Sequence, residues 1–263
     1  MAEFELHRYP RSRRATFDVG RIGRAKHHIV ALVEVDVTEA RARVRAAIRG
    51  GRKLGFNAWL LKVIADTIAQ DAQVQAINQR RRQQVVFRDV DIAVPIERVV
   101  DGVKVPLATV VRGADGKTVE AIDAELREAR RQPLAGADAY VLERRNKGWQ
   151  AAAFVRLPQW LRLLVWRALL GSPFLRKQTM GTVMVTNTGL SGSVSGWLVP
   201  KSIHNLCFGI GSMTKRPWVV AGEVAVRDIL KLTILFDHDA VDGAPAARFT
   251  ASLVRNLERP LGP

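Results

Sequence analysis

The chain has 263 residues, enough for one large domain or two small ones, and its 48% hydrophobic content excludes wholesale disorder. The only cysteine, Cys207, excludes a disulfide framework within the chain, and no apolar run follows the basic residues at the start, which argues against a secretory signal and for a cytoplasmic protein. Lys and Arg number 41 against 25 Asp and Glu. The resulting net charge of +16 predicts an anionic partner: a phosphate-bearing small molecule, a membrane surface, nucleic acid or an acidic protein.

The positive charge is concentrated in two segments, residues 8–26 and residues 144–178. The first contains a single acidic residue, Asp18, and the second contains none. In the second segment the basic residues alternate with Trp, Leu and Phe, while arginines and Pro158 make it a poor membrane span. Three interpretations remain open for it: a helix packed on its own domain or on a neighbouring subunit, a helix lying on a membrane surface, and a docking site for a protein partner.

The first half of the chain predicts alternating strands and helices. Valines alternate with acidic residues in Ile29–Val37, which is typical of a half-buried strand. A helix is expected from Thr38 to about Gly50, and another from Asn57, where apolar residues recur on one face.

Further strands are expected along the rest of the chain, and most are short and apolar. They are Val85–Phe87, Val90–Ile96, Lys104–Val111 after a turn at Asp101-Gly102, Thr182–Val185, Leu206–Ile210 and Leu232–Phe236. Helices are expected after Thr118 and after Gly243. Because strands and helices are mixed without strict alternation, the sequence predicts an α/β or α+β fold with a mixed sheet.

The best candidate for chemistry is the run from Asp237 to Gly243. Here an apolar strand ends in His238, and the carboxylate of Asp242 follows four residues later. A histidine at a strand end can act as a general base near neutral pH. The alternatives are a purely structural polar turn and a calcium loop. The calcium loop is disfavoured because Arg248 occupies the position that needs a bidentate glutamate.

Several motifs in chain order resemble one family. They are Val33–Thr38, Lys53–Leu60, Asp89–Pro95 followed by Asp101–Pro106, Gly181–Gly189, and Asp237–Gly243 with the following Ala-Pro-Ala-Ala-Arg-Phe. They are similar to the acyltransferase cores of the dihydrolipoamide acyltransferases of 2-oxoacid dehydrogenase complexes, relatives of chloramphenicol acetyltransferase. The resemblance implies a chloramphenicol-acetyltransferase-like α/β fold, a mixed sheet flanked by helices. It also implies a homotrimer with active sites at the subunit interfaces.

The resemblance also implies a chemistry and roles for three residues. His238 aligns with the catalytic base, and Asp242 with the residue that orders the active-site turn. Thr186 aligns with a hydroxyl that stabilises the oxyanion from the neighbouring subunit. Coenzyme A, as acyl-CoA, would be a substrate, and the acceptor would be a dihydrolipoyl-type thiol or another small molecule. The chain is expected to carry no covalently bound lipoyl group, so a lipoyl domain acting in trans is an implied partner.

Some features depart from the family pattern. Asp239 stands where the family usually has arginine, and the segment 144–178 has no counterpart there. We therefore expect a basic amino-terminal arm at 1–27 and a catalytic domain at 28–263 that contains the basic amphipathic insert. Too few residues precede the core for a lipoyl or subunit-binding domain, and the apolar carboxy-terminal tail used in cages is missing, so we expect a stand-alone trimer. The alternative is an inactive trimeric scaffold or a membrane-docked partner. Nucleic-acid binding is disfavoured because the sequence contains no known nucleic-acid-binding motif.

Overall fold

The computed structural model describes residues 4–6, 13–79, 82–100, 103–131, 153–154, 156–187 and 194–259. The predicted turn at residues 101–102 and the first part of the insert, residues 144–152, lie outside this described part. The principal elements are α1 (Arg13–Arg24), β1 (His28–Asp36), α2 (Thr38–Arg49), α3 (Phe56–Gln70), β2 (Ile77–Gln79), β3 (Gln83–Val85), β4 (Ile92–Val100), β5 (Val103–Val111), α4 (Val119–Arg131), α6 (Gln159–Leu170), α7 (Pro173–Met180), β6 (Val183–Asn187), β7 (Leu206–Val220), β8 (Glu223–Asp237) and α8 (Gly243–Glu258).

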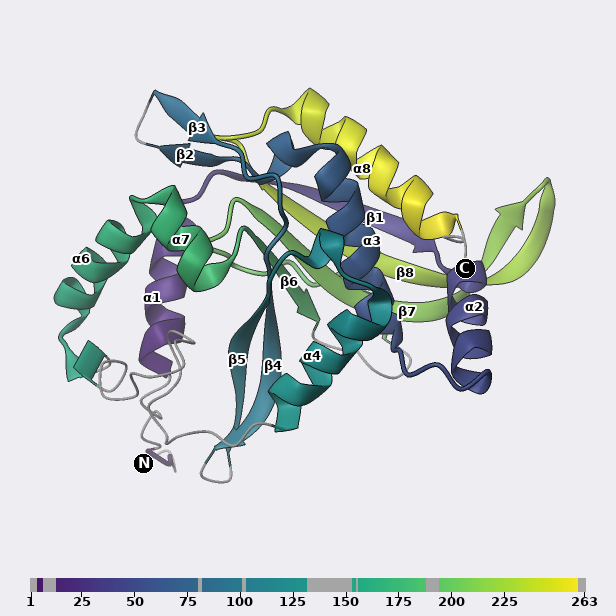
Figure 1. The fold of residues 1–263 in the computed structure, drawn as a ribbon, viewed down its shortest axis with the longest axis horizontal. Coiled ribbons are helices and arrows are strands. Elements are labelled where there is room, and N and C mark those ends of the chain that lie inside the picture. The colour runs from purple at the N-terminus through teal and green to yellow at the C-terminus, as the bar shows by residue number, and fades with distance from the viewer. Residues whose placement is uncertain are drawn as a thin grey trace.

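A six-stranded mixed sheet organises the molecule, in the order β1-β8-β7-β6-β4-β5. Strand β6 runs parallel to both β4 and β7, and the other pairs are antiparallel. This arrangement confirms the predicted α/β fold with a mixed sheet. A separate two-stranded sheet, β2–β3, stands beside the carboxyl end of β8 (Figure 1).

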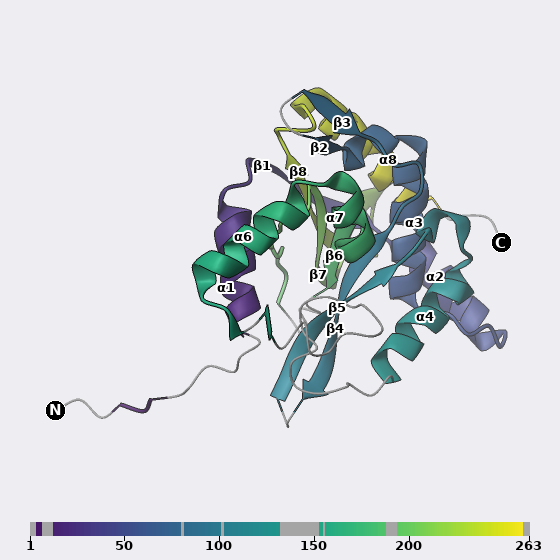
Figure 2. The same ribbon diagram turned by 60° about the vertical axis from the view of Figure 1, so that its left-hand side comes forward.

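Helices α2, α3, α4 and α8 lie together on one side of the main sheet, while α1 and α6 lie on the other (Figure 2). The core fills the space between α3, α8 and the sheet. Ile64 of α3 and Phe249 of α8 are fully or almost fully buried against Phe208 of β7 and Phe236 of β8. The 3.6-residue spacing of apolar side chains in α8 thus faces the inward residues of two strands, as the sequence predicts.

On the opposite face, a loop takes the place of a helix layer at the centre of the sheet. A Cβ on Gly209 would lie 2.5 Å from the backbone oxygen of Leu198, and one on Gly211 would lie 2.6 Å from that of Gly196. Only glycine permits so close an approach between the loop and β7. The loop therefore follows the face of the sheet at the level of these glycines.

Strands β7 and β8 extend well beyond the segments predicted from sequence, as 15-residue strands that form a long hairpin. A register shift between Ile210 and Met213 separates the buried half from the outer half. The outer half projects away from the body of the molecule (Figure 1), and valines at its tip are exposed. The sequence analysis did not predict the outer half because most of its residues are exposed and lack the apolar pattern of a buried strand.

The basic amino-terminal segment and the basic insert pack on each other. Asp18 of α1 is fully buried and receives two bonds from the guanidinium of Arg162 in α6, at 2.7 and 2.9 Å. Beside this pair, Trp166, Leu169, Met180 and Ile203 form a small apolar cluster. The insert therefore uses one face to pack on its own chain, and helix α1 is an element that the sequence analysis missed.

Candidate functional site

His238 stands at the carboxyl end of β8, directly after the last residue of the sheet. Its backbone N–H donates to the carbonyl oxygen of His27 at 2.9 Å, which continues the β1–β8 ladder by one bond. Its side chain is 49% exposed. The imidazole is thus fixed at its backbone by two strands, while its ring remains accessible to a substrate.

The turn that follows His238 is held from two sides. The backbone carbonyl of Asp237 accepts bonds from the N–H groups of Ala240 and Val241, at 2.9 and 3.0 Å. From the β2–β3 sheet, the amide of Asn78 donates to the carbonyl of Asp239, and the amide of Gln84 donates to that of Ala240. These bonds explain the position of the small sheet: it clamps the turn that carries the histidine.

The structure brings together His238 and Asp242, two of the predicted site residues. Their closest atoms, His238 Nδ1 and Asp242 Oδ1, are 3.9 Å apart, which is close enough for an ion pair but too long for a hydrogen bond. Asp242 precedes α8, its side chain caps no backbone group, and it is 86% exposed. A small rotation of either side chain would bring the carboxylate to the ring.

Asp239 has a partner of its own. Its carboxylate lies 3.0 Å from Nδ1 of His27. This hydrogen bond raises the pKa of His27 and lowers the pKa of Asp239. The residue that departs from the family pattern therefore ties the turn to the segment that precedes β1.

A buried charge network supports the turn from behind, and sequence reasoning missed it. The ammonium of Lys26 donates to Asp237 at 2.5 Å and to the Oδ1 atom of Asn205 at 2.8 Å. The guanidinium of Arg176, in α7, donates to the same Asn205 oxygen at 3.0 Å. The network joins the amino-terminal segment and the insert to the residue before His238. Because these residues are far apart in the sequence, no local pattern predicts the network.

Burial sets the ionisation of this network. It lowers the pKa of Lys26, with a further contribution from the nearby Arg176. It also lowers the pKa of Arg176 to about 10. His204, fully buried beside them, has a pKa lowered to about 3 by burial and by the charge of Arg176, so its imidazole is neutral at pH 7. The Asp237 side chain thus lies among basic side chains, in direct contact with Lys26.

Thr186, the third predicted residue, lies away from His238 within one chain. It sits on β6 opposite Gly209 of β7, which in turn lies opposite Thr233 of β8. Thr233 precedes His238 by five positions, so the threonine is displaced along the sheet by roughly 17 Å and by two strands across it. Its side chain is half-buried. One chain does not assemble all three predicted residues.

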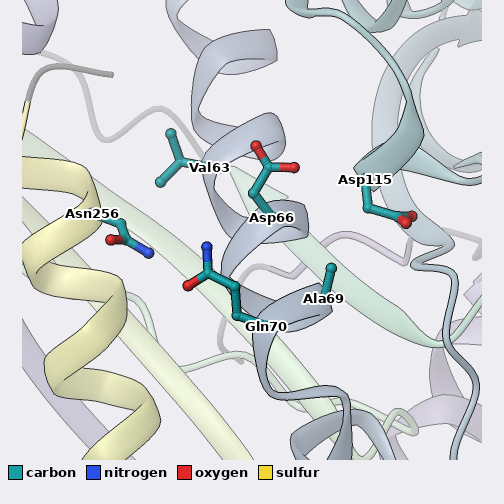
Figure 3. Close-up of a pocket in the computed structure, with 6 residues that line it drawn as sticks. All are labelled: Val63, Asp66, Ala69, Gln70, Asp115 and Asn256. Atoms are coloured by element: carbon teal, nitrogen blue, oxygen red, sulfur yellow. The ribbon is translucent and has the colours of Figure 1, made fainter. Parts of the chain in front are cut away.

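Two cavities among the described residues differ in character. A polar one of about 330 Å³ lies between α3 and α8 and includes Asp66, Asp115 and Asn256 (Figure 3). Its carboxylates are engaged, since Asp66 pairs with Lys62 and Asp115 accepts the N–H of Val90. It contains none of the predicted site residues.

The second cavity is an apolar groove of about 620 Å³ between edge strand β1 and α8. It begins at Gly243, at the end of the histidine turn. Its walls are aliphatic residues of β1 and small residues of α8, including Ala247 and Ala251. Unlike the polar cavity, this groove is continuous with the candidate site.

Two kinds of feature are absent from the described residues. No cluster of three or more His, Cys, Asp or Glu that could hold a metal ion was found among them. No helix in the same part of the chain has the length and apolar character needed to cross a membrane.

Comparison with known proteins relates the carboxy-terminal part of the chain to one family. Residues 150–262 match the model of the 2-oxoacid dehydrogenases acyltransferase catalytic domain, a span that contains β6 to α8 and the histidine turn. This carboxy-terminal part of the chain is similar to the 2-oxoacid dehydrogenase acyltransferases. The resemblance inferred from the motifs is thereby confirmed.

Individual acyltransferases agree with this assignment. The bovine mitochondrial dihydrolipoyllysine-residue succinyltransferase component of the 2-oxoglutarate dehydrogenase complex is 24% identical over 229 residues, which is 86% of this chain and 42% of the bovine protein. The chain spans less than half the length of the curated relatives it matches.

Solved structures share the fold over almost the whole chain. Azotobacter vinelandii dihydrolipoamide acetyltransferase, studied for the catalytic roles of a serine, a histidine and an asparagine, superposes with a TM-score of 0.67 at 20% identity, covering 98% of this chain and 92% of that one. A chloramphenicol acetyltransferase gives 0.50 at 13% identity, covering 97% and 98%. The expected chloramphenicol-acetyltransferase-like fold is therefore confirmed.

Proposed function

We propose that this chain transfers an acyl group between coenzyme A and a small thiol of the dihydrolipoyl type, with His238 as general base. The observation that carries the proposal is the histidine turn. An accessible imidazole is held at the end of a buried strand, clamped by two sheets, in a chain whose carboxy-terminal part is similar to the acyltransferases. Fixing a base in this way supplies the orientation that acid–base catalysis requires.

The proposed reaction begins when the His238 ring takes the proton from the attacking thiol. The sulfur attacks the carbonyl carbon of the acyl thioester, and negative charge builds on the carbonyl oxygen. When the intermediate collapses, the bond to the first sulfur breaks, and the imidazolium returns its proton to the departing thiolate. Asp242, 3.9 Å from the ring, favours the imidazolium that forms in between.

We assign Thr186 as the donor to the developing oxyanion, from a neighbouring subunit. In the Azotobacter enzyme the serine precedes the histidine by 52 positions, and the asparagine follows it by four. Thr186 and Asp242 have the same two spacings from His238 in this chain. Since a single chain separates the threonine from the histidine, the proposal requires at least two chains, and we infer a homotrimer.

Two surfaces support the trimer. Strand β1 is an edge strand on which Val30 and Leu32 are about half exposed, and unpaired apolar edges are templates for association. The projecting β7–β8 hairpin exposes Val219, Val224 and Val226. We propose that these surfaces meet between subunits.

The division into an arm at 1–27 and a catalytic domain at 28–263 with an insert at 144–178 remains part of this proposal. The basic surface provides charge that favours the phosphates of coenzyme A. A lipoyl domain acting in trans is the proposed acyl partner. The inactive-scaffold alternative is disfavoured because the family match and the accessible histidine turn occur together.

The decisive experiment measures consumption of acetyl-, isobutyryl- and longer acyl-CoAs with dihydrolipoamide as acceptor. We expect turnover by the wild type and a loss of about 10²–10⁴-fold in His238→Ala, because general-base catalysis is worth that much. The variant at a neighbouring exposed residue, Arg248→Gln, is the control. Equal turnover in His238→Ala and the wild type would refute the assignment of the base.

Mixing two inactive variants tests the subunit interface directly. His238→Ala and Thr186→Ala chains, denatured together and refolded in equal amounts, should form trimers in which about a quarter of the interfaces carry both intact residues. Activity should therefore return to about a quarter of the wild-type value. If mixing restores nothing while each variant assembles normally, the shared site is wrong.

A further inference from the structure

The insert helix α6 is apolar on both of its faces. Its inner face buries Trp166 and Leu169, whereas its outer face exposes Trp160 by 64% and Leu164 by 53%. On the adjoining helix α7, Phe174 is 61% exposed. A helix that is apolar all round is normally buried on all sides. We therefore expect the outer face of α6 to bind a second surface in addition to its own chain.

The charges around this outer face have one sign. Residues 144–180 include no acidic side chain. Arg156 and Arg167 are exposed, and Arg167 shares the outer side of α6 with Trp160 and Leu164 because these residues are three to four positions apart. Two arginines of this segment are buried: Arg162 pairs with Asp18, and Arg176 of α7 donates to Asn205. Arg167 on α6 and Arg156, which precedes α6, are exposed and therefore remain available to an anionic surface.

We propose that the outer face of α6 and α7, formed by Trp160, Leu164, Arg167 and Phe174, docks on an anionic phospholipid surface together with the exposed Arg156 that precedes α6. Helix α6 has 12 residues and would lie in the plane of the interface with its inner face still on α1. Trp, Leu and Phe would enter the boundary between headgroups and acyl chains, and the arginines would contact phosphates.

The position of the face fits this role. Figure 2 shows α6 and α7 together on the side of the molecule toward the viewer, and Figure 1 shows the β7–β8 hairpin at the opposite end. The proposed lipid contact and the hairpin contact between subunits therefore use different surfaces. The proposal does not depend on acyl transfer.

The test is co-sedimentation of the full chain with vesicles of phosphatidylcholine, with and without phosphatidylglycerol. We expect binding to the anionic vesicles that weakens with salt. Arg156→Gln with Arg167→Gln should lower the partition coefficient roughly 30-fold, because each arginine near an anionic leaflet contributes a factor of about five. Trp160→Ser with Leu164→Ser should abolish pelleting at low protein concentration.

The chain offers matched controls on helix α2. Arg45→Gln with Arg49→Gln removes the same net charge from exposed positions, and Ile48→Ser removes an exposed aliphatic residue. Both should bind like the wild type. Failure of the wild type to bind anionic vesicles, or equal weakening by the α2 controls, would overturn the proposal. A change of oligomeric state in Trp160→Ser with Leu164→Ser would also overturn it, since another copy of the chain would then cover this face.

Discussion

At the scale of single residues, His238 depends on groups that lie far away in the chain. The residue before it, Asp237, pairs with Lys26. Lys26 also donates to Asn205, whose side-chain oxygen accepts a second bond from Arg176. A buried carboxylate without its cation is costly, so the geometry of the histidine turn rests on this network. Lys26 acts through Asp237 and is a positioning residue.

Replacing Lys26 tests this dependence. Lys26→Met should lower the free energy of unfolding by about 3–5 kcal/mol, because Asp237 stays buried without its partner. It should also lower kcat by roughly 10²-fold with little change in KM, because a displacement of the base by about 1 Å is enough to cost that much in rate. Urea unfolding and steady-state kinetics measure the two effects.

Two companion variants separate positioning from mere stability. Lys26→Arg keeps the charge and should retain most of kcat. Lys26→Met combined with Asp237→Asn removes both charges and should recover stability but not kcat. Full recovery of kcat in this double variant would show that the network serves the fold alone.

Thr186 makes a sharper catalytic prediction. Thr186→Ala should lower kcat by about 10²–10³-fold, the usual loss for one donor to an oxyanion. Thr186→Ser keeps the hydroxyl and should stay within a few-fold of the wild type. An alanine variant as active as the serine variant would contradict the assigned role.

At the scale of elements, the two basic segments exist as a pair of helices. Helices α1 and α6 are joined by the buried Asp18–Arg162 ion pair and by the small apolar cluster beside it, and no local sequence pattern predicts this pairing. The charges at their interface balance: Asp18 of α1 neutralises Arg162, the buried arginine of α6. The network at Arg176 then extends the contact to the site.

Breaking this pair should loosen both helices. Asp18→Asn leaves the Arg162 guanidinium buried without a counter-charge, and we expect a loss of about 3–5 kcal/mol in the free energy of unfolding. Asp18→Leu with Arg162→Met removes both charges and should be much less destabilising. Hydrogen exchange should report the loss first in α1 and α6; unchanged exchange in these helices would refute the pairing.

The edge strand makes a second prediction at this scale. Leu32→Glu places a charge on the exposed side of β1 and should dissociate the proposed trimer while leaving the fold of one chain intact. Ile48→Glu, at a similarly exposed aliphatic residue of α2, is the control and should leave assembly unchanged. Analytical ultracentrifugation and circular dichroism measure the two properties, and a Leu32→Glu trimer would exclude β1 from the interface.

At the scale of the whole molecule, buried ionisable groups fix the response to acid. The pKa of His204 falls from 6.5 to about 3 on folding, so the unfolded chain binds a proton that the folded chain does not. The stability contributed by the neutral imidazole is fully present above pH 6.5 and is lost as the pH falls toward 3.

This group should therefore add a slope of up to about 1.4 kcal/mol per pH unit to the free energy of unfolding below pH 5.5. His204→Gln keeps an N–H donor for the carbonyl of Met180 and should remove that slope. Urea unfolding between pH 7 and about pH 4.5 separates the histidine from the carboxylates, most of which stay ionised there. Parallel curves for the variant and the wild type would contradict the assignment.

The sequence predicted those parts of the molecule that depend on local pattern. The alternation in β1, the 3.6-residue spacing in α3 and α8, and the strand that ends at His238 are encoded within a few residues of each other. The motifs revealed the resemblance to the acyltransferases for the same reason, since each one is a short stretch whose residue types suffice to recognise it.

Only the tertiary structure decided which distant residues meet. Helix α1, the β2–β3 clamp and the network of Lys26, Asn205 and Arg176 depend on contacts between segments that are separated by up to 211 positions. The pairing of Asp239 with His27 was decided in the same way. Such contacts form because burying a charge or a polar turn requires a partner from whichever segment the fold brings near, and no local pattern records that choice.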